Sequence, residues 1–211
     1  MKVVPVADAV AHVADIAKSL GDGGLACIPI RGAYRMLADA RSQAAINKLA
    51  QSKRRAHNRP ALIMVADLAA AKDIVDGTAW PTTAKLTKAL WPGPLTLVLP
   101  PSKRLDTKIA KVLSRSTGRI GVRVPDDSLS TAIINEFGGP LLVSSANIES
   151  KPGASSASAV RQRFERMLDI WVDAGDVRPE APSTLVELSE SEWKVVREGA
   201  VKRAAIEKAL R

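Results

Sequence analysis

The sequence contains very little cysteine, histidine or aromatic residue. Its 211 residues include one cysteine, Cys27, and two histidines, His12 and His57. A single cysteine excludes an intrachain disulfide and a cysteine-based metal site, and two histidines argue against zinc. Cys27 lies in the apolar run 25–28, so we expect a buried thiol and not a nucleophile. Aromatic residues make up 3% of the chain, so Ala, Val, Leu and Ile must build the core.

Long apolar runs and glycine-rich phosphate loops are also missing. No segment is long enough to span a bilayer and no signal peptide is apparent, so we expect a cytoplasmic protein without a membrane partner. Neither the Walker spacing nor Gly-x-Gly-x-x-Gly occurs, and no histidine-centred catalytic set is visible. A bound nucleotide would therefore be held by cationic side chains and polar loops.

The charge balance is strongly basic, with 31 Lys and Arg against 22 Asp and Glu and a net charge of +9. Such a surplus favours polyanionic partners: nucleic acid, nucleotide phosphates or acidic membranes. Charge alone leaves a soluble protein with a basic surface equally open. The length and the 46% apolar content suit a single globular domain spanning residues 1–211.

Hydrophobic periodicity predicts amphipathic helices mixed with short apolar strands. The predicted helices cover 7–20, 42–51, 68–75, 82–90, 128–137, 159–167 and 200–210. The predicted strands cover 25–30, 61–65, 95–99, 119–124, 141–144, 170–172, 184–186 and 193–197. Because the two types do not alternate strictly, we predict an α/β (α+β) fold with a mixed sheet and helices packed on it, and not a regular doubly wound fold.

A basic cluster, Lys53, Arg55 and Arg59, follows a predicted helix and precedes an apolar strand. Lysine offers phosphate a mobile point charge, and arginine binds phosphate or carboxylate with a flat, bidentate fork. Such clusters are more often solvated faces, so this feature alone favours no function.

Two further features lie on or directly after predicted strands. Ser145 and Asn147 follow strand 141–144, and the carboxyl ends of strands are where α/β sheets bind ligands. An ordinary turn is the alternative there. Arg123 lies inside an apolar strand, which is costly unless the guanidinium is paired or faces a cleft.

Taken in order, these segments resemble the YrdC-like family of threonylcarbamoyl-AMP synthases. The matching pieces are Lys53-x-Arg55 with Arg59-Pro60, LWPGPLT at 90–96, GVRVP at 121–125, SSAN at 144–147, Lys151-Pro152, PST at 182–184 and VREG at 196–199. The match covers nearly the whole chain. It implies a twisted mixed β-sheet with helices packed around a basic concave cavity.

The resemblance implies an enzyme, a nucleotidyltransferase that condenses ATP, L-threonine and bicarbonate into threonylcarbamoyl-AMP and pyrophosphate. Mg²⁺ would assist. The product would feed threonylcarbamoyladenosine modification of tRNA, which implies tRNA and other tRNA-modification proteins as partners. Binding of double-stranded RNA is also associated with this fold.

The same resemblance assigns residues by position. It assigns catalysis to Lys53 and Arg55, and it assigns no metal ligand and no general base. The residues implied for the nucleotide are Arg59, Asn147, Ser155 and Arg197. The residues implied for the amino acid are Arg123, Ser145 and Ser183.

The chain departs from the family pattern on the threonine side. Members carry Pro-Thr-Asp/Glu-Thr-x-Tyr-Gly-Leu where this chain has PIRGAYRM at 29–36, so Ile30 and Gly32 replace two threonines. Met64 replaces a common histidine, and Arg119 a common threonine. A site that hydrogen-bonds a substrate hydroxyl discriminates less well without its polar partners, so another amino acid is an open alternative.

A paralogue with altered catalysis, similar to the YciO branch, is a further alternative. It would bind double-stranded RNA or a nucleotide, because added positive charge suits a phosphate backbone. The added cations are Arg31, Arg35, Arg54 and Arg119. A carbamoyl-transfer module like those of hydrogenase maturation is a third alternative, which the short chain disfavours.

Overall fold

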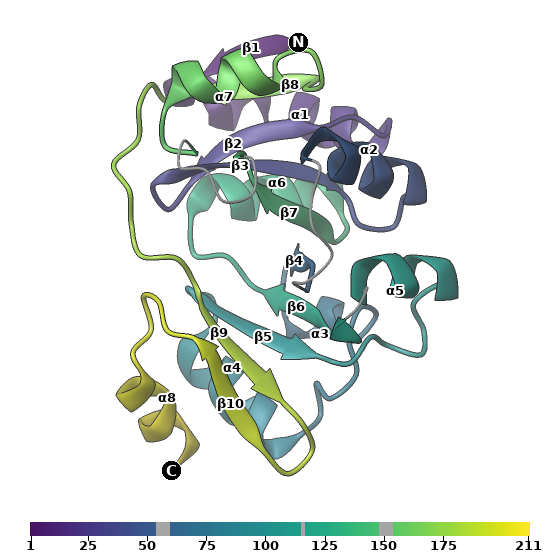
Figure 1. Ribbon diagram of the computed structural model, residues 1–211, viewed down its shortest axis with the longest axis vertical. Coiled ribbons are helices and arrows are strands. Elements are labelled where there is room, and N and C mark those ends of the chain that lie inside the picture. The colour runs from purple at the N-terminus through teal and green to yellow at the C-terminus, as the bar shows by residue number, and fades with distance from the viewer. Residues whose placement is uncertain (54–59, 115–116, 148–153) are drawn as a thin grey trace. The chain divides into compact units, whose positions relative to one another are not determined.

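The protein is described here by a computed structural model in which residues 1–53, 60–114, 117–147 and 154–211 are placed, apart from the side chain of Lys53. The chain forms two compact units (Figure 1). The first unit comprises Met1–Ala56 and Asp127–Glu180, and the second comprises His57–Asp126 and Ala181–Arg211.

The first unit contains a five-stranded mixed sheet in the order β1, β8, β2, β3, β7. The strands are β1 (Lys2–Pro5), β8 (Ile170–Asp173), β2 (Ala26–Ile30), β3 (Ala33–Asp39) and β7 (Leu141–Ser145). β8 is parallel to both β1 and β2, whereas β3 is antiparallel to both β2 and β7. The carboxyl ends of β2 and β7 and the start of β3 therefore lie at one end of this sheet.

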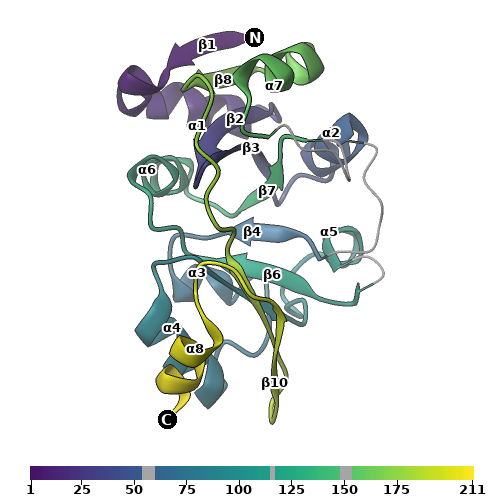
Figure 2. The same ribbon diagram turned by 60° about the vertical axis from the view of Figure 1, so that its left-hand side comes forward.

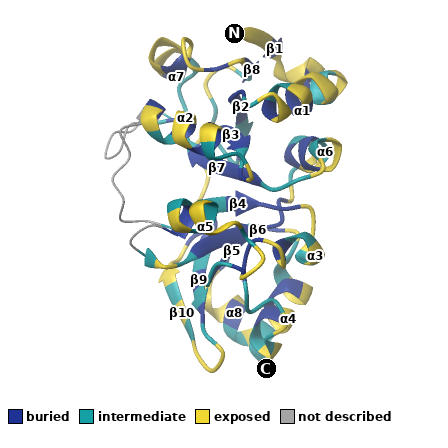
Figure 3. Ribbon diagram, turned by 90° about the vertical axis from the view of Figure 1, so that its right-hand side faces the viewer, coloured by how far each residue is buried: buried dark blue, intermediate teal, exposed yellow. Residues whose placement is uncertain are grey.

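Helices cover both faces of the first sheet. They are the 3-10 helix η1 (Val6–His12), α1 (Val13–Gly21), α2 (Gln43–Lys53), α6 (Ser128–Phe137) and α7 (Ala157–Phe164). α1 and α6 pack together on one face, and α2 and α7 lie on the other (Figures 2 and 3). The core includes Tyr34 and Trp171, whose rings meet edge to face at 5.7 Å. Cys27 is buried as expected, and burial raises the pKa of its thiol.

The second unit contains another five strands, in the order β4, β6, β5, β9, β10. They are β4 (Leu62–Met64), β6 (Ile120–Arg123), β5 (Leu95–Leu99), β9 (Thr184–Leu188) and β10 (Trp193–Arg197). The β4–β6 and β5–β9 pairs are parallel, and the β5–β6 and β9–β10 pairs are antiparallel. Its helices are α3 (Leu68–Ala71), α4 (Pro81–Leu90), α5 (Thr107–Ser114) and α8 (Arg203–Leu210).

The predicted class, a mixed sheet with helices packed on it, is confirmed, but several elements differ. The helix predicted over 7–20 is a 3-10 helix up to His12, and the helix predicted over 68–75 ends at Ala71. The first segment contains Val6 and Val10, and β-branched residues lower the propensity for an α-helix. In the second, Val75 instead forms a bridge with Pro101. Within the described part of the chain, no helix is both long and apolar enough to cross a membrane.

Three elements are absent from the sequence-based prediction: β1, β3 and α5. β1 has only four residues, and Arg35 interrupts the apolar run of β3. α5 carried a visible signal, because Ile109, Val112 and Leu113 follow helical spacing after Asp106. The Asp106 carboxylate accepts from the amides of residues 108 and 109 in the first turn.

Candidate functional site

Strand register in the second unit brings polar side chains to one end of its sheet. β4 and β6 run parallel with Met64 opposite Arg123. β5 enters the sheet at the same end, and its Thr96 is almost fully buried. The Thr96 hydroxyl donates to the hydroxyl of Ser183, which immediately precedes β9, at 3.0 Å. Arg123, Thr96 and Ser183 therefore belong to one cluster.

Arg123 is only 4% exposed at the end of β6. Its Nη2 donates to Sδ of Met64 at 3.5 Å. A thioether is a weak and uncharged acceptor, so Met64 orients the guanidinium without contributing charge. A buried guanidinium at a strand end is suited to bind an anionic group.

Arg197 joins this cluster from β10. The β9–β10 ladder has a bulge between Val195 and Arg197, and such bulges redirect side chains. Arg197 Nη2 donates to the carbonyl oxygen of Ser183 at 2.8 Å. The segments predicted from PST and VREG thus meet, and the second unit unites three of the predicted residues: Arg123, Ser183 and Arg197.

The hydroxyl of Thr184 fixes the backbone around Arg197. Its Oγ1 donates to the carbonyl of Val201 at 2.6 Å and accepts from the amides of Gly199 and Val201 at 2.9 and 3.1 Å. A Cβ on Gly199 would lie 2.1 Å from the carbonyl oxygen of Pro182, so only glycine fits there. Sequence reasoning included Thr96 and Thr184 in its motifs but assigned neither a role.

The first unit holds the other described candidates. Ser145 ends β7 opposite Arg35 of β3. The Tyr34 carbonyl accepts from the Ala146 amide at 2.9 Å, and the Tyr34 amide donates to the carbonyl of Ala154 at 2.6 Å. The segments that carry Ser145 and Asn147 on one side, and Ser155 on the other, are therefore joined through the backbone of Tyr34.

Tyr34 itself is an internal anchor. Its hydroxyl donates to the carbonyl of Gly175 at 2.7 Å and accepts from the amide of Ala174 at 2.9 Å. Burial is the main cause that raises the pKa of the Tyr34 phenol, so this group stays protonated and keeps donating at neutral pH.

The turn between β2 and β3 is filled by protein. Ile30 is 3% exposed, and Arg31 and Gly32 both have positive φ angles, of 48° and 65°. A Cβ on Gly32 would lie 2.1 Å from the carbonyl oxygen of Arg178, so no side chain fits. Arg31 Nη2 lies 3.6 Å from a carboxylate oxygen of Glu180. Ile30 and Gly32, which stand where the family has two threonines, are therefore packed against other parts of the protein.

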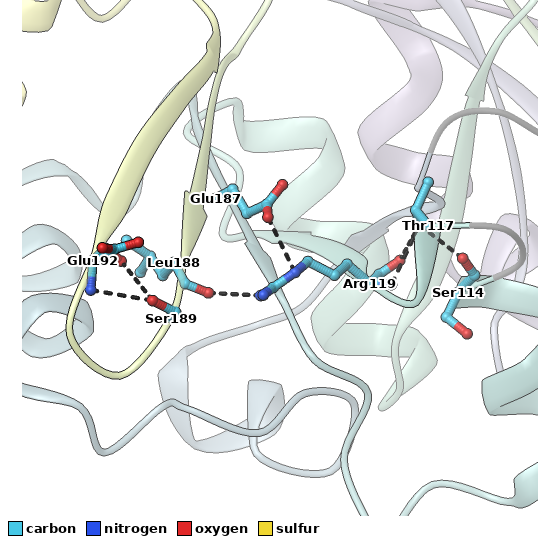
Figure 4. Close-up of polar contacts among 7 residues, drawn as sticks. All are labelled: Ser114, Thr117, Arg119, Glu187, Leu188, Ser189 and Glu192. Carbon is cyan, nitrogen blue, oxygen red and sulfur yellow. Dashed lines mark hydrogen bonds and ion pairs between the residues drawn. The ribbon is translucent and has the colours of Figure 1, made fainter.

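Arg119 also serves the fold of its unit. Its Nη1 donates to the carbonyl of Leu188 at 2.7 Å, and its Nε lies 3.2 Å from Oε1 of Glu187 (Figure 4). Thr117 holds the same turn by donating to the carbonyls of Ser114 and Arg119. Arg119 therefore ties the start of β6 to the end of β9, at the opposite end of β6 from Arg123.

Part of the predicted site lies outside the described residues. Arg55 and Arg59 are in the segment 54–59, as is Arg54. Lys53 is the last residue of α2, and its side chain is not described. Their roles, and the basic concave cavity implied by the resemblance, stay predictions.

These features define a mixed α/β protein with hydroxyl, amide and guanidinium groups gathered at strand ends. A family model for Sua5, YciO and YrdC proteins, which bears the description "Telomere recombination", matches residues 18–199. The chain belongs to this family, which confirms the resemblance found in the sequence.

Relatives in this family carry a consistent name. The threonylcarbamoyl-AMP synthase of Pyrococcus abyssi is 30% identical over 90% of this chain and 54% of its own length. That of Bacillus subtilis is 27% identical over 94% of this chain and 56% of its own length. The crystal structure of P. abyssi Sua5 complexed with L-threonine superposes with a TM-score of 0.82 at 28% identity, covering 95% of this chain and 57% of that one. This chain thus spans about half the length of these relatives.

Proposed function

We propose that this chain is a threonylcarbamoyl-AMP synthase and that residues 1–211 form a single domain of that family. It would convert ATP, L-threonine and bicarbonate into threonylcarbamoyl-AMP, pyrophosphate and water. The observation that carries the proposal is the second-unit cluster, in which two family segments meet at Ser183 beside the buried Arg123. The threonine bound by the similar Sua5 supports the choice of amino acid.

The reaction asks for positioning and charge neutralisation more than for acid–base chemistry. The amino group of threonine and bicarbonate would first form an N-carboxylate (carbamate) with loss of water. An oxygen of that carbamate then forms a bond to the α-phosphorus of ATP, and the bond from that phosphorus to pyrophosphate breaks. Lys53 and Arg55 would neutralise the charge that develops on the phosphates. Arg59 and Arg197 would hold the nucleotide through charge-assisted hydrogen bonds to its phosphates.

The uncharged candidates would supply orientation. Asn147 and Ser155 would hydrogen-bond the nucleotide, and Ser145 and Ser183 the amino acid, with Arg123 as the cation on that side. The positions of Ile30 and Gly32 contribute no hydroxyl, so threonine would be distinguished from other amino acids by the remaining groups.

Mg²⁺ would enter with the triphosphate of ATP. Mg²⁺ in such sites is commonly bound by substrate phosphates and few protein ligands, so the phosphate oxygens would be its main ligands. The product would serve tRNA modification in the cytoplasm, with tRNA and other modification proteins as downstream partners.

The RNA-binding alternative is not favoured. Two of the cations that motivated it, Arg31 and Arg119, lie beside Glu180 and Glu187 respectively. Any phosphate contact from these side chains would compete with those carboxylates.

Pyrophosphate release tests the proposed function. We expect release from ATP only when both bicarbonate and an amino acid are present, with threonine compared against serine and valine. Calorimetric titration with ATP and then threonine, with and without bicarbonate, should show each binding step. Absence of pyrophosphate release with every amino acid would contradict the proposal, and binding of double-stranded RNA that weakens steeply with salt would favour the alternative.

A further inference from the structure

Residues 174–178, which follow β8 and are called the strap below, are fixed to the first unit at their start. The amide of Ala174 and the carbonyl of Gly175 both bond the buried hydroxyl of Tyr34, at 2.9 and 2.7 Å. The Asp173 carboxylate accepts from the Gly175 amide at 2.9 Å. The strap therefore leaves the sheet in a defined direction.

The strap then contacts the segment that carries Ser155. The amide of Val177 donates to the carbonyl of Ser155 at 2.8 Å. One residue earlier, Oδ1 of Asp176 accepts from the amide of Ala157, the first residue of α7, also at 2.8 Å. Two hydrogen bonds thus attach the strap to either side of Ser156.

The carboxylate of Asp176 caps the N-terminus of α7, a role that the N-cap residue normally has. Ser156 occupies the N-cap position of α7, but its side chain makes no capping bond, and its Oγ lies 3.1 Å from Oγ of Ser158. The carboxylate of Asp176 takes that role from another segment, where its negative charge also suits the helix N-terminus. The start of α7 is therefore fixed by the strap.

Ser155 is held from the other side as well. The carbonyl of Ala154 accepts from the amide of Tyr34 at 2.6 Å. Tyr34 thus fixes the residue before Ser155 directly and fixes the strap through its hydroxyl. Main-chain bonds therefore hold the backbone on both sides of Ser155. Among the described bonds between the strap and the Ser155 segment, the bond from Asp176 is the only one made by a side chain.

We infer that Asp176 is a positioning residue for the nucleotide: it holds the Ser155 segment and the start of α7 in the conformation that binds ATP. This inference rests on the proposed function and on the assignment of Ser155 to the nucleotide. Asp176 is exposed and would touch no substrate itself. Its loss should therefore weaken nucleotide binding selectively.

The test compares Asp176→Ala and Asp176→Asn with a matched control, Asp106→Ala. Asp106 caps α5 through two main-chain amides in the second unit and belongs to no candidate cluster. We expect Asp176→Ala to raise the KM for ATP about fivefold, because the lost capping bond no longer stabilises the conformation that binds the nucleotide. The KM for threonine should stay the same. Asparagine can also cap a helix, so Asp176→Asn should recover most of the ATP affinity.

Direct binding measurements distinguish the positioning role of Asp176 from the proposed function. The affinity of each variant for a non-hydrolysable ATP analogue would be measured by calorimetry, and circular dichroism would check that each variant is folded. An unchanged affinity in Asp176→Ala, or an equal loss in Asp106→Ala, would overturn the positioning role while leaving the proposed function intact. Failure of the wild-type protein to bind the analogue at all would instead contradict the proposed function.

Discussion

The first unit presents its described candidates as hydroxyl and amide side chains, whereas the second combines the hydroxyl of Ser183 with two guanidinium groups, Arg123 and Arg197. Ser145, Asn147 and Ser155 lie on segments held by main-chain bonds to Tyr34 and the strap. Arg123 and Arg197 lie on strands, where Arg123 donates to the Met64 thioether and Arg197 donates to the main-chain carbonyl of Ser183. The first arrangement suits recognition of polar edges, and the second suits binding of negative charge.

Each unit also has one buried hydroxyl that organises its polar segment. In the first unit it belongs to Tyr34, which joins the strap to β3. In the second it belongs to Thr184, which joins the segment after Arg197 to β9. Both groups bond main-chain atoms of the polar segments, so their loss should affect stability more than chemistry.

Removal of the buried charge should give the largest effect. Arg123→Met keeps an unbranched apolar side chain about as long as the aliphatic stem of arginine but removes the guanidinium cation. We expect kcat/KM for pyrophosphate release to fall about 100-fold, because a hydrogen bond to a charged group contributes about 1.5–3 kcal/mol. Urea denaturation of the variant checks that the lost activity does not reflect unfolding. Activity close to that of the wild type would remove Arg123 from the site.

Thr184→Val tests the organising hydroxyl of the second unit. The substitution is nearly isosteric and leaves two buried amides and one carbonyl without their Thr184 bonds. We expect the free energy of unfolding to fall by about 2–3 kcal/mol, measured by urea denaturation. An unchanged free energy of unfolding would show that the hydroxyl is dispensable.

Tyr34→Phe is that matching variant. It removes bonds to one carbonyl and one amide while keeping the ring against Trp171. The expected loss is about 1–2 kcal/mol, with a melting temperature lower by about 2–4 °C for each kcal/mol. Amide hydrogen exchange should increase first in the strap, and exchange that changes only elsewhere would contradict the anchoring role.

Arg119→Met asks whether an added cation serves RNA or the fold. The variant loses the bond to Leu188 and the ion pair with Glu187, which should reduce stability by about 1 kcal/mol because both groups are partly exposed. We expect pyrophosphate release to stay unchanged. An intact stability combined with weaker RNA binding in a filter assay would reverse this interpretation.

Asp169→Asn should give the smallest effect. Partial burial alone would raise the pKa of this carboxyl, but hydrogen bonds from Lys48 and the Leu25 amide hold it below its ordinary value of 3.8. The wild-type advantage, about 0.5 kcal/mol for an exposed pair, is then fully present above the ordinary pKa. It disappears as the pH falls through the lowered pKa. Urea denaturation from pH 7 to pH 3 checks this trend, and a constant difference would contradict it.

Much of the fold follows from local apolar patterns. The strands around Cys27, Leu97 and Val143 are continuous buried runs, which identify them as interior strands. The strand β3 escaped prediction because Arg35 interrupts its apolar run and because its turn uses Arg31 at a positive φ, which is uncommon for a residue with a side chain. Register and strand order depend on contacts between distant segments, which a single sequence does not reveal.

The candidate residues were more predictable than the residues that support them. Arg123 was found because an arginine inside an apolar strand is unusual. Ser183 and Arg197 were found because their motifs resemble a known family, and the second unit brings these two together. Tyr34 was visible as a residue shared with the family pattern, but its partners lie some 140 residues away in the sequence. Asp176 had no signal, since its capping bond crosses from one segment to another.

The most direct measurement follows labelled bicarbonate into the product. The protein would be incubated with ATP, Mg²⁺, L-threonine and carbon-13 bicarbonate, and the adenylate analysed by mass spectrometry. We predict a threonylcarbamoyl adenylate that carries the label, formed together with pyrophosphate and much reduced in Arg123→Met. An adenylate without label, or no adenylate from a folded protein that binds ATP, would contradict the account.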